Sequence, residues 1–535
     1  MRPEKRSSDF LKGTLILTVA ALIIKVLSAI YRVPFQNMVG DVGFYIYQQV
    51  YPFYGVAFVL ATSGFPVVIS KMYTEHIAKK GKQDIQSFFI ICTMVLMAIG
   101  LSCFAFLYLG AEWLAVQMND PQLAPLLRMV SITFLIIPVI ALFRGYFQGV
   151  GNMVPTAVSQ VGEQLVRVLL IFLAAFVLIH QGYDLYIVGS GAVLGSVIGG
   201  IVSILILFLY YWMGKERPIT KIQLGDFKDS GKIVKSLLTQ GLAICISSML
   251  LILMQLADSL NLYAVLVTTG LDSEEAKELK GIYDRGQPLI QLGMVVATSM
   301  SLSLVPLITS EKLKEKQGLI HDKIRLALQI GLFIGVGATV GLWSIMKQTN
   351  TMLFENSDGS NVLGVLSLLI LFTSIIITTM AILQGLGIIY FPAMMVILGF
   401  GFKYLLNIIL IPPFGTLGAA IASAIALCVI MMVLLYRLKV FLKKGFMNIR
   451  FIFIVIVAAI VMMIVLKVYL FITGHLPHNG YGRLFAGFQA ISAVVIGGIT
   501  YLWIVLKGRT FKEEELMMLP FGSKLLLFLP KRKRR

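Results

Sequence analysis

The chain has 535 residues, of which 58% are hydrophobic and 13% are charged, and its mean hydropathy is +0.89. A soluble domain carries about twice this share of charged residues, so the composition excludes a soluble protein and indicates an integral membrane protein. The net charge of +19 does not indicate nucleic-acid binding, because the Lys and Arg residues gather in alternate loops between apolar runs.

The apolar runs are continuous rather than alternating, which excludes a β-barrel and predicts an all-α polytopic membrane protein. At about 20 residues per span, the chain has room for about 14 transmembrane helices. We expect them at 13–33, 44–70, 86–109, 124–147, 155–179, 185–212, 233–264, 286–309, 320–346, 362–386, 390–412, 415–437, 450–473 and 484–507. Three glycines, Gly191, Gly195 and Gly199, recur every four residues in the sixth span, which predicts close packing against another helix.

The loops between these spans alternate in their content of Lys and Arg. The basic segments are the N-terminus, the second loop around 71–82, the mid-chain loop around 215–235, the loops at 310–325 and 437–450, and the tail ending KRKRR. The intervening loops near 110–122, 180–185 and 348–361 are poor in Lys and Arg. Basic loops stay on the cytoplasmic side, so we expect both termini to be cytoplasmic.

A sequence repeat divides the chain into two halves. Ile46 and Tyr47 recur 236 positions later as Ile282 and Tyr283, and Ala61-Thr62-Ser63 recurs as Ala297-Thr298-Ser299. This offset contains six expected spans, an even number, which predicts a parallel repeat of two six-helix lobes. We expect an N-lobe at 1–212, a cytoplasmic linker at 213–232, a C-lobe at 233–438, two added helices within 450–507 and a basic cytoplasmic tail at 508–535.

Few ionisable residues remain inside the spans, and each is costly at membrane depth. Those that we single out are Lys25, Arg32, Glu163, Arg167, Asp258, Asp284, Arg285 and Lys403. Glu163 and Arg167 are four residues apart on one helix, which suits either an ion pair between them or contacts with a ligand. We expect Glu163, Arg167, Asp258, Asp284 and Lys403 to compensate charge or to couple transport to ions.

The remaining cations suggest an anionic ligand. Lys25 and Arg32 are seven residues apart and share one helix face, and Arg285 begins a span in the second half. These three cations exceed the nearby acids, so we expect them to bind an anionic head group, a phosphate above all.

The sequence contains no catalytic or metal-binding pattern of known geometry. No GxxxxGK[ST] loop that would bind ATP occurs, and no HExxH segment is found. We therefore expect no enzymatic activity, no cofactor and no metal site, and an H⁺ or Na⁺ gradient or the membrane potential as the driving force.

Three segments, KVLSAIYRVPFQNMVG, FRGYFQGVGNMVPTAVSQVGEQLVR and YDRGQPLIQLG, together carry a resemblance to a known family. The chain resembles the multidrug/oligosaccharidyl-lipid/polysaccharide exporter superfamily. Within it, the chain is similar to the bacterial branch of stage V sporulation protein B and the MurJ-type lipid II flippases. The resemblance implies a multi-pass protein of the bacterial cell membrane, with two lobes around a cavity that opens alternately to either side.

The resemblance also implies a substrate. A flippase of this branch moves a polyprenyl-pyrophosphate-linked saccharide, such as lipid II or a polysaccharide precursor, to the outer leaflet without breaking a covalent bond. By position, Lys25, Arg32 and Arg285 would hold the pyrophosphate, and proteins of cell-wall or polysaccharide synthesis would be partners. The alternatives are a cation-coupled multidrug antiporter of the same superfamily and a membrane glycosyltransferase, whose catalytic loop the short outer loops do not supply.

Overall fold

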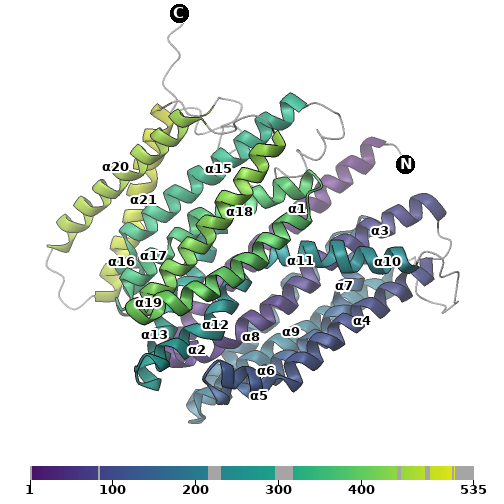
Figure 1. The fold of residues 1–535 in the computed structure, drawn as a ribbon, viewed down its shortest axis with the longest axis horizontal. Coiled ribbons are helices and arrows are strands. Elements are labelled where there is room, and N and C mark those ends of the chain that lie inside the picture. Colours follow the sequence, from purple (N-terminus) through teal and green to yellow (C-terminus); the bar gives the residue numbers. More distant parts are fainter. Residues whose placement is uncertain are drawn as a thin grey trace, which may run out of the picture. The chain divides into compact units, whose positions relative to one another are not determined.

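The computed structural model describes residues 3–81, 85–214, 230–295, 317–442, 448–475, 482–508 and 511. In these ranges every regular element is a helix, and no strand occurs (Figure 1). The span expected at 286–309 is described only as far as residue 295, and most of the expected linker and basic tail lie outside the described residues.

The chain divides into two compact units. Unit 1 contains residues 1–284 and 388–422, and unit 2 contains residues 285–387 and 423–535. Unit 1 therefore takes residues from both halves of the sequence repeat, and the lobe boundaries expected from that repeat stay a prediction.

Unit 1 begins with nine α-helices and two short helical segments. They are α1 (Pro3–Ile30), α2 (Arg32–Val59), the π-helical η1 (Leu60–Gly64), α3 (Phe65–Lys80), α4 (Ile85–Leu109), α5 (Ala111–Gln117), the 3₁₀ segment η2 (Pro121–Leu123), α6 (Ala124–Ser131), α7 (Thr133–Val150), α8 (Val154–His180) and α9 (Leu185–Met213). It continues with α10 (Ser230–Ser236), the π-helical η3 (Leu237–Gly241), α11 (Leu242–Ser248), α12 (Leu250–Thr268), α13 (Ser273–Asp284) and the first part of α19 (Tyr390–Leu442).

Unit 2 begins at Arg285, and residues 286–295 are helical. Its other helices are α15 (Gln317–Ser344), α16 (Met346–Phe354), α17 (Ser360–Leu366), α18 (Leu368–Gly385), the remainder of α19, α20 (Ile449–Gly474) and α21 (Gly482–Lys507). The aromatic ring of Tyr501 on α21 stacks on Phe333 of α15, with ring centroids 5.1 Å apart.

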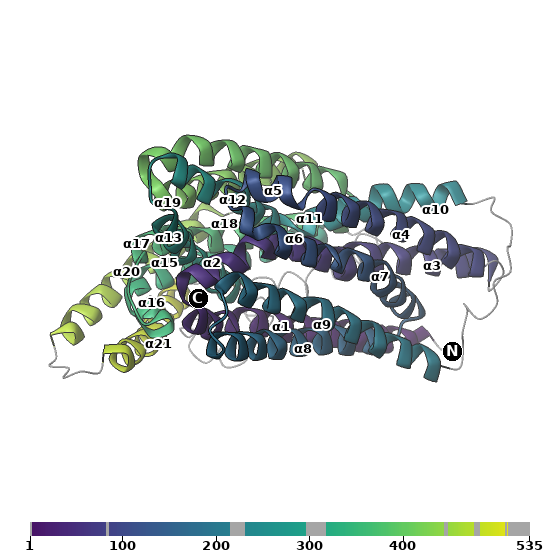
Figure 2. The same ribbon diagram turned by 90° about the horizontal axis from the view of Figure 1, so that it is seen from below.

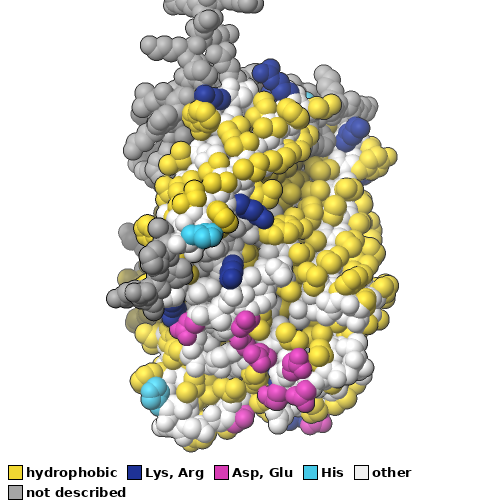
Figure 3. Space-filling model, turned by 90° about the vertical axis from the view of Figure 1, so that its left-hand side faces the viewer, with side chains coloured by type: hydrophobic (Ala, Val, Ile, Leu, Met, Phe, Trp, Pro, Cys, Tyr) yellow, Lys and Arg dark blue, Asp and Glu magenta, His cyan; other side chains and the backbone are white. Residues whose placement is uncertain are grey.

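Eleven helical segments in the described ranges are long and apolar enough to cross a membrane. Two of them are long enough for two expected spans each: Ile16–Lys79 covers 13–33 and 44–70 nearly completely, and Tyr390–Leu442 covers 390–412 and 415–437. The face drawn in Figure 3 is covered over a broad area by hydrophobic side chains, as lipid contact requires. The prediction of an all-α polytopic membrane protein is confirmed.

Helices α8 and α9 pack side by side (Figures 1 and 2), and the glycines of α9 make this contact close. A Cβ atom added at Gly199 would lie 2.8 Å from the backbone oxygen of Glu163, and one at Gly195 would lie 3.2 Å from that of Arg167. At Gly199 a side chain would overlap the backbone of α8, so glycine is required there for this close approach. The packing prediction for these glycines is confirmed, and the contact fixes the part of α8 that carries Glu163 and Arg167.

The start of α2 contains one break in the helix. The backbone stays helical from α1 into α2, because Tyr31 has helical dihedral angles and donates its N–H to the Leu27 carbonyl, whereas Gly40 has φ of 70°, which interrupts α2. The buried faces of α2, α8 and α9 then form one core cluster that includes Phe35, Tyr47 and Ile171. Arg32 lies beside this cluster, because its guanidinium contacts the rings of Tyr31 and Tyr51, which belong to the cluster or pack against it.

Candidate functional site

Arg32, the first residue of α2, is completely buried. Its guanidinium carbon lies 4.4 Å from the ring centroid of Tyr51 and 5.7 Å from that of Tyr31. None of its three guanidinium nitrogens has a hydrogen-bond partner within the described part of the chain. Cation–π contacts contribute about 0.5–2 kcal/mol each, which is less than the cost of burying a guanidinium alone.

Arg167 of α8 shares the same tyrosines and is also buried. Its guanidinium carbon lies 4.8 Å from the ring centroid of Tyr54 and 5.6 Å from that of Tyr31. The hydroxyls of Tyr51 and Tyr54 contact the Arg167 side chain, while its Nε has no hydrogen-bond partner among the described residues.

Together these side chains form what we call the arginine–tyrosine cluster, which consists of Arg32, Arg167, Tyr31, Tyr47, Tyr51 and Tyr54. The hydroxyls of Tyr31 and Tyr47 lie 2.9 Å apart in a hydrogen bond. Over the ranges that the structure describes, neither arginine forms an ion pair with a carboxylate. The cluster therefore holds two buried positive charges whose neutralisation requires an anion.

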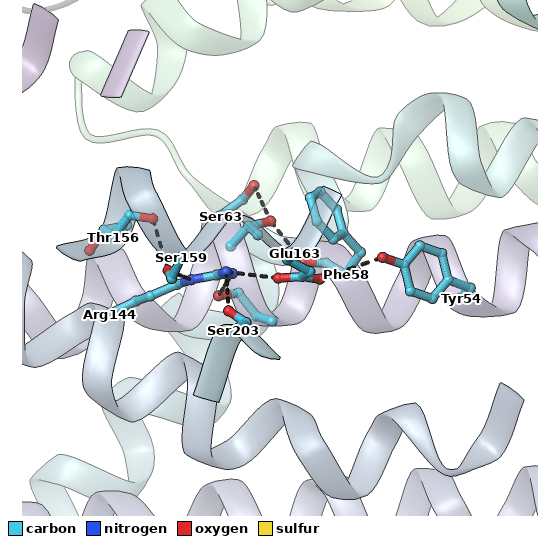
Figure 4. Close-up of polar contacts among 10 residues, drawn as sticks. Tyr54, Phe58, Ser63, Arg144, Thr156, Ser159, Glu163 and Ser203 are labelled. Carbon is cyan, nitrogen blue, oxygen red and sulfur yellow. Dashed lines mark hydrogen bonds and ion pairs between the residues drawn. The ribbon is translucent and has the colours of Figure 1, made fainter. Parts of the chain in front are cut away.

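Glu163 pairs with Arg144 of α7, not with Arg167, so the pair suggested by their spacing on α8 does not form (Figure 4). Arg144 Nη2 donates to Glu163 Oε2 at 2.8 Å and to Ser203 Oγ at 2.9 Å. Arg144 Nε donates to Ser159 Oγ, and Nη1 donates to the carbonyl of Ala61 in the π-helical segment η1. Glu163 pairs with Arg144 because Arg144 extends to it from the neighbouring helix α7. All three guanidinium nitrogens of Arg144 donate hydrogen bonds there, which fixes its position.

Sequence reasoning missed Arg144, which lies in the expected span 124–147 near its end. The available signal was a lone Arg inside an apolar run, next to the Glu163 of the following span. Tyr54 connects the two groups, because its hydroxyl donates to Glu163 Oε1 at 3.5 Å and its ring lies against Arg167.

Asp258 and Lys403, which are 145 residues apart in the sequence, form a second buried ion pair. Lys403 Nζ of α19 donates to Asp258 Oδ2 of α12 at 2.6 Å and to the carbonyl of Met254 at 2.7 Å. Asn407 Nδ2 donates to Asp258 Oδ1, and the Tyr283 hydroxyl donates to Asp258 Oδ2. Lys403 and Asp258 are 1% and 2% exposed, so this group is sealed from solvent.

Asp284 also has a cationic partner, since Lys280 Nζ of the same helix α13 lies 2.5 Å from its Oδ2. The sequence analysis did not single out Lys280, because α13 lies between the expected spans 233–264 and 286–309. Each of the three carboxylates singled out from the sequence is thus held in an ion pair.

Lys25 and Arg285 lie outside these groups. Lys25 is partly exposed on α1 and has no ion-pair partner in the described residues. Arg285 is in unit 2, where it is completely buried, donates from Nη1 to Asn356 Oδ1 at 2.6 Å and lies 5.3 Å from the ring centroid of Phe354. In the described residues, no three His, Cys, Asp or Glu side chains gather as a metal site.

Comparison with known proteins places the chain in a family. The family "Polysaccharide biosynthesis protein" matches residues 10–311. The chain is 42% identical over 523 residues to the uncharacterized membrane protein YabM of Bacillus subtilis, with 97% of both chains covered. It is 25% identical to the lipid II flippase MurJ of the same organism, covering 93% of this chain and 95% of MurJ. It is 26% identical to stage V sporulation protein B, also of B. subtilis, covering 97% and 99%.

Solved structures share the fold. The inward closed conformation of a lipid II flippase MurJ superposes with a TM-score of 0.61 at 16% identity, covering 92% of this chain and 98% of that one. The inward-facing conformation of a multidrug resistance MATE family transporter gives a TM-score of 0.62 at 15% identity, covering 82% and 99%. The chain is thus a transporter and not an enzyme, and it belongs to the polysaccharide biosynthesis protein family, in the branch of the multidrug/oligosaccharidyl-lipid/polysaccharide exporter superfamily that contains MurJ and stage V sporulation protein B.

Proposed function

We propose that the protein is a flippase that moves a polyprenyl-pyrophosphate-linked saccharide to the outer leaflet of the bacterial cell membrane. The observation that carries this proposal is the arginine–tyrosine cluster, with two buried guanidinium groups that have no carboxylate partner among the described residues. A diphosphate supplies the missing negative charge, and arginine binds phosphate oxygens through paired N–H donors. Lipid II and the lipid-linked precursors of polysaccharides both present this group.

In this proposal Arg32 and Arg167 bind the diphosphate, and Lys25 on α1 contacts it as the substrate enters. Arg285 of the second half stays a proposed contact from the opposite lobe. The prenyl chain remains in the lipid while the head group crosses, so no covalent bond changes. The basic loops and both termini would face the cytoplasm, where these precursors are made.

The kink at Gly40 supports a way to load this site. Gly40 has φ of 70° and interrupts α2 eight residues after Arg32. A change of angle at this kink would expose the cluster, which is occluded in the present conformation. The driving force would be the membrane potential or an ion gradient.

The proposal is tested in a bacterial strain depleted of its own lipid II flippase, with an assay for lipid II exposed at the outer leaflet. At equal protein level, we expect the wild type to restore exposure and Arg32→Gln and Arg167→Gln each to reduce it at least about 10-fold, the loss expected for one charge-assisted contact. Arg32→Lys keeps the charge and serves as the matched variant, with an intermediate effect. Full rescue by both Gln variants would contradict the assigned site.

Failure of the wild type to rescue would exclude lipid II as the substrate, and the same leaflet assay with other polyprenyl-pyrophosphate saccharides would then decide the proposal. No transport of any of them would overturn it. A cation-coupled multidrug antiporter is the alternative, because MATE structures match the fold as well as MurJ does. A positively charged cluster repels cationic drugs, so efflux of such a drug that is abolished by Asp258→Asn would favour this alternative.

A further inference from the structure

The buried group around Lys403 has the composition of a cation-binding site. Its acceptors are the Asp258 carboxylate and the Met254 carbonyl, both of which contact the Lys403 ammonium directly. Two amide side chains complete the surroundings: Asn407 Nδ2 donates to Asp258 Oδ1 at 3.1 Å and to Asn261 Oδ1 at 2.8 Å. Carboxylate, backbone carbonyl and Asn oxygens are the ligands that hard cations take in proteins.

One of these amide oxygens forms no hydrogen bond within the described ranges. It is Oδ1 of Asn407, whose side chain is completely buried. Rotation of the amide would exchange Nδ2 and Oδ1 and turn this oxygen toward Asp258 and Asn261. In the described part of the chain the Lys403 ammonium contacts only Asp258 and Met254, so this oxygen is available to a cation that replaces the ammonium.

The charge balance defines which cation the site would take. Asp258 supplies one negative charge, and the Lys403 ammonium supplies one positive charge at 1% exposure. A divalent ion would leave an excess positive charge in a sealed interior, while an alkali ion would match the carboxylate. The ammonium, tethered to α19, therefore occupies the place of a monovalent cation.

We propose that Met254, Asp258, Asn261 and Asn407 form an alkali-cation site that the Lys403 ammonium fills permanently, so that this protein carries its own cation and does not bind Na⁺ from solution. The inference is independent of the substrate proposed above. It predicts that Na⁺ does not change the thermal stability of the wild-type protein. It also predicts that removal of the ammonium creates a Na⁺ site.

The test uses purified full-length protein and measures the thermal midpoint of unfolding in NaCl and in choline chloride at equal ionic strength. Choline is larger than the space that the Lys403 ammonium would leave, whereas Na⁺ fits it. A difference between the two salts therefore reports Na⁺ in the site. For the wild type we expect the same midpoint in both salts. For Lys403→Met we expect a midpoint below that of the wild type in choline, raised in NaCl by about 3 °C or more as Na⁺ binds the folded state.

Two control variants test whether Na⁺ binding requires the whole proposed site or only a buried carboxylate that has lost its cation. Lys403→Met combined with Asp258→Asn removes both charges, and we expect no difference between the salts. Lys280→Met leaves Asp284 without its ammonium partner, and no amide side chain bonds to Asp284 in the described residues, so we expect a lower midpoint in both salts and no gain from NaCl.

Several outcomes would overturn the proposal. They are a wild-type midpoint that depends on Na⁺, a Lys403→Met midpoint that does not, and a response to NaCl in Lys280→Met as large as that in Lys403→Met. Lys403→Gln provides a second neutral side chain. If both neutral variants fail to fold even in NaCl, the proposal is also wrong, because Na⁺ in the site would replace the lost charge.

Discussion

At the scale of single residues, unit 1 contains buried charges of two kinds. Glu163 and Asp258 are matched by Arg144 and Lys403, and their hydrogen bonds are largely satisfied. Arg32 and Arg167 have no carboxylate partner in the described part of the chain, although burying a charge without a partner costs several kcal/mol. A residue that lowers stability in this way is retained for what it binds, so the two kinds of charge should respond oppositely to substitution.

Replacing Arg32 by Met should separate stability from transport. The substitution removes an unpaired buried charge and keeps an unbranched side chain beside Tyr51, so we expect the thermal midpoint to stay equal or rise. Transport of the lipid-linked substrate should fall at least about 10-fold, because the anion loses a charge-assisted contact. Thermal unfolding and the leaflet assay on the same preparation check this prediction. A midpoint several degrees lower would mean that Arg32 is structural.

Replacing Arg144 by Met should have the opposite effect. It leaves the Glu163 carboxylate buried without a cation, which costs about 3–5 kcal/mol. Adding Glu163→Met removes the stranded charge, so we expect the double variant to recover most of the lost stability. Thermal unfolding of the two single variants and the double variant gives the coupling between the side chains. Additive losses would show that the ion pair in Figure 4 does not hold α7 on α8.

These pairings explain why the sequence predicted the charges and not their partners. Each of these ionisable residues is a charged residue within an apolar segment of the sequence, so Arg32, Glu163 and Asp258 could be identified directly. Their partners depend on which helices touch. Glu163 and Arg167 have the spacing of an ion pair, but α7 brings Arg144 to Glu163 from 19 residues away in sequence. Nothing in one sequence connects Asp258 with Lys403.

At the scale of elements, glycines set how closely helices approach and where they bend. The spans themselves were predictable, because hydropathy and length are local properties. Gly415, with φ of 57° and ψ of −138°, breaks α19 between the expected spans 390–412 and 415–437, so the two spans are separate as predicted. Helices outside the spans were not predictable in this way: α13 lies between the expected spans 233–264 and 286–309, and it packs on α2 and α12.

The contact between α13 and α2 depends on Gly281. A Cβ atom there would lie 2.1 Å from the backbone oxygen of Asp41, and backbone cannot yield as a flexible side chain can. We therefore expect Gly281→Ala to push α13 away from α2, to speed amide hydrogen exchange in α13 and to lower the thermal midpoint.

Gly401→Ala is the matched control for this substitution. Gly401 lies inside α19 and its added Cβ would meet no atom within 4 Å. Alanine favours a helix interior over glycine by about 1 kcal/mol, so we expect an unchanged or higher midpoint and unchanged exchange in α13. Equal effects of the two substitutions would show that the α13–α2 contact is loose.

At the scale of the whole molecule, the repeat and the contacts divide the chain differently. The repeat predicts an N-lobe at 1–212, whereas unit 1 also contains residues 230–284 and 388–422. Within unit 1, α2 packs on α12 and α13, and η1 packs on α11. The first half of the chain is therefore covered by helices from the second half, and alternating access would require some of these contacts to break and reform.

This arrangement predicts how the chain tolerates being cut. A cut in the expected linker 213–232 interrupts no membrane span, so we expect co-expressed fragments 1–220 and 221–535 to purify together and to retain transport. Fragment 1–220 alone should be degraded, because the faces of α2 and η1 that meet α11, α12 and α13 would be exposed. A cut in the middle of α8 is the control, since it divides the helix that carries Glu163 and Arg167 and should yield no complex.

Fragment 1–220 that stays folded by itself would mean that the N-lobe is autonomous and that its contacts with α11, α12 and α13 contribute little to its stability. Those contacts would then be free to open during transport at small energetic cost, whereas degradation of the lone fragment would mean that any opening must be compensated by contacts made elsewhere.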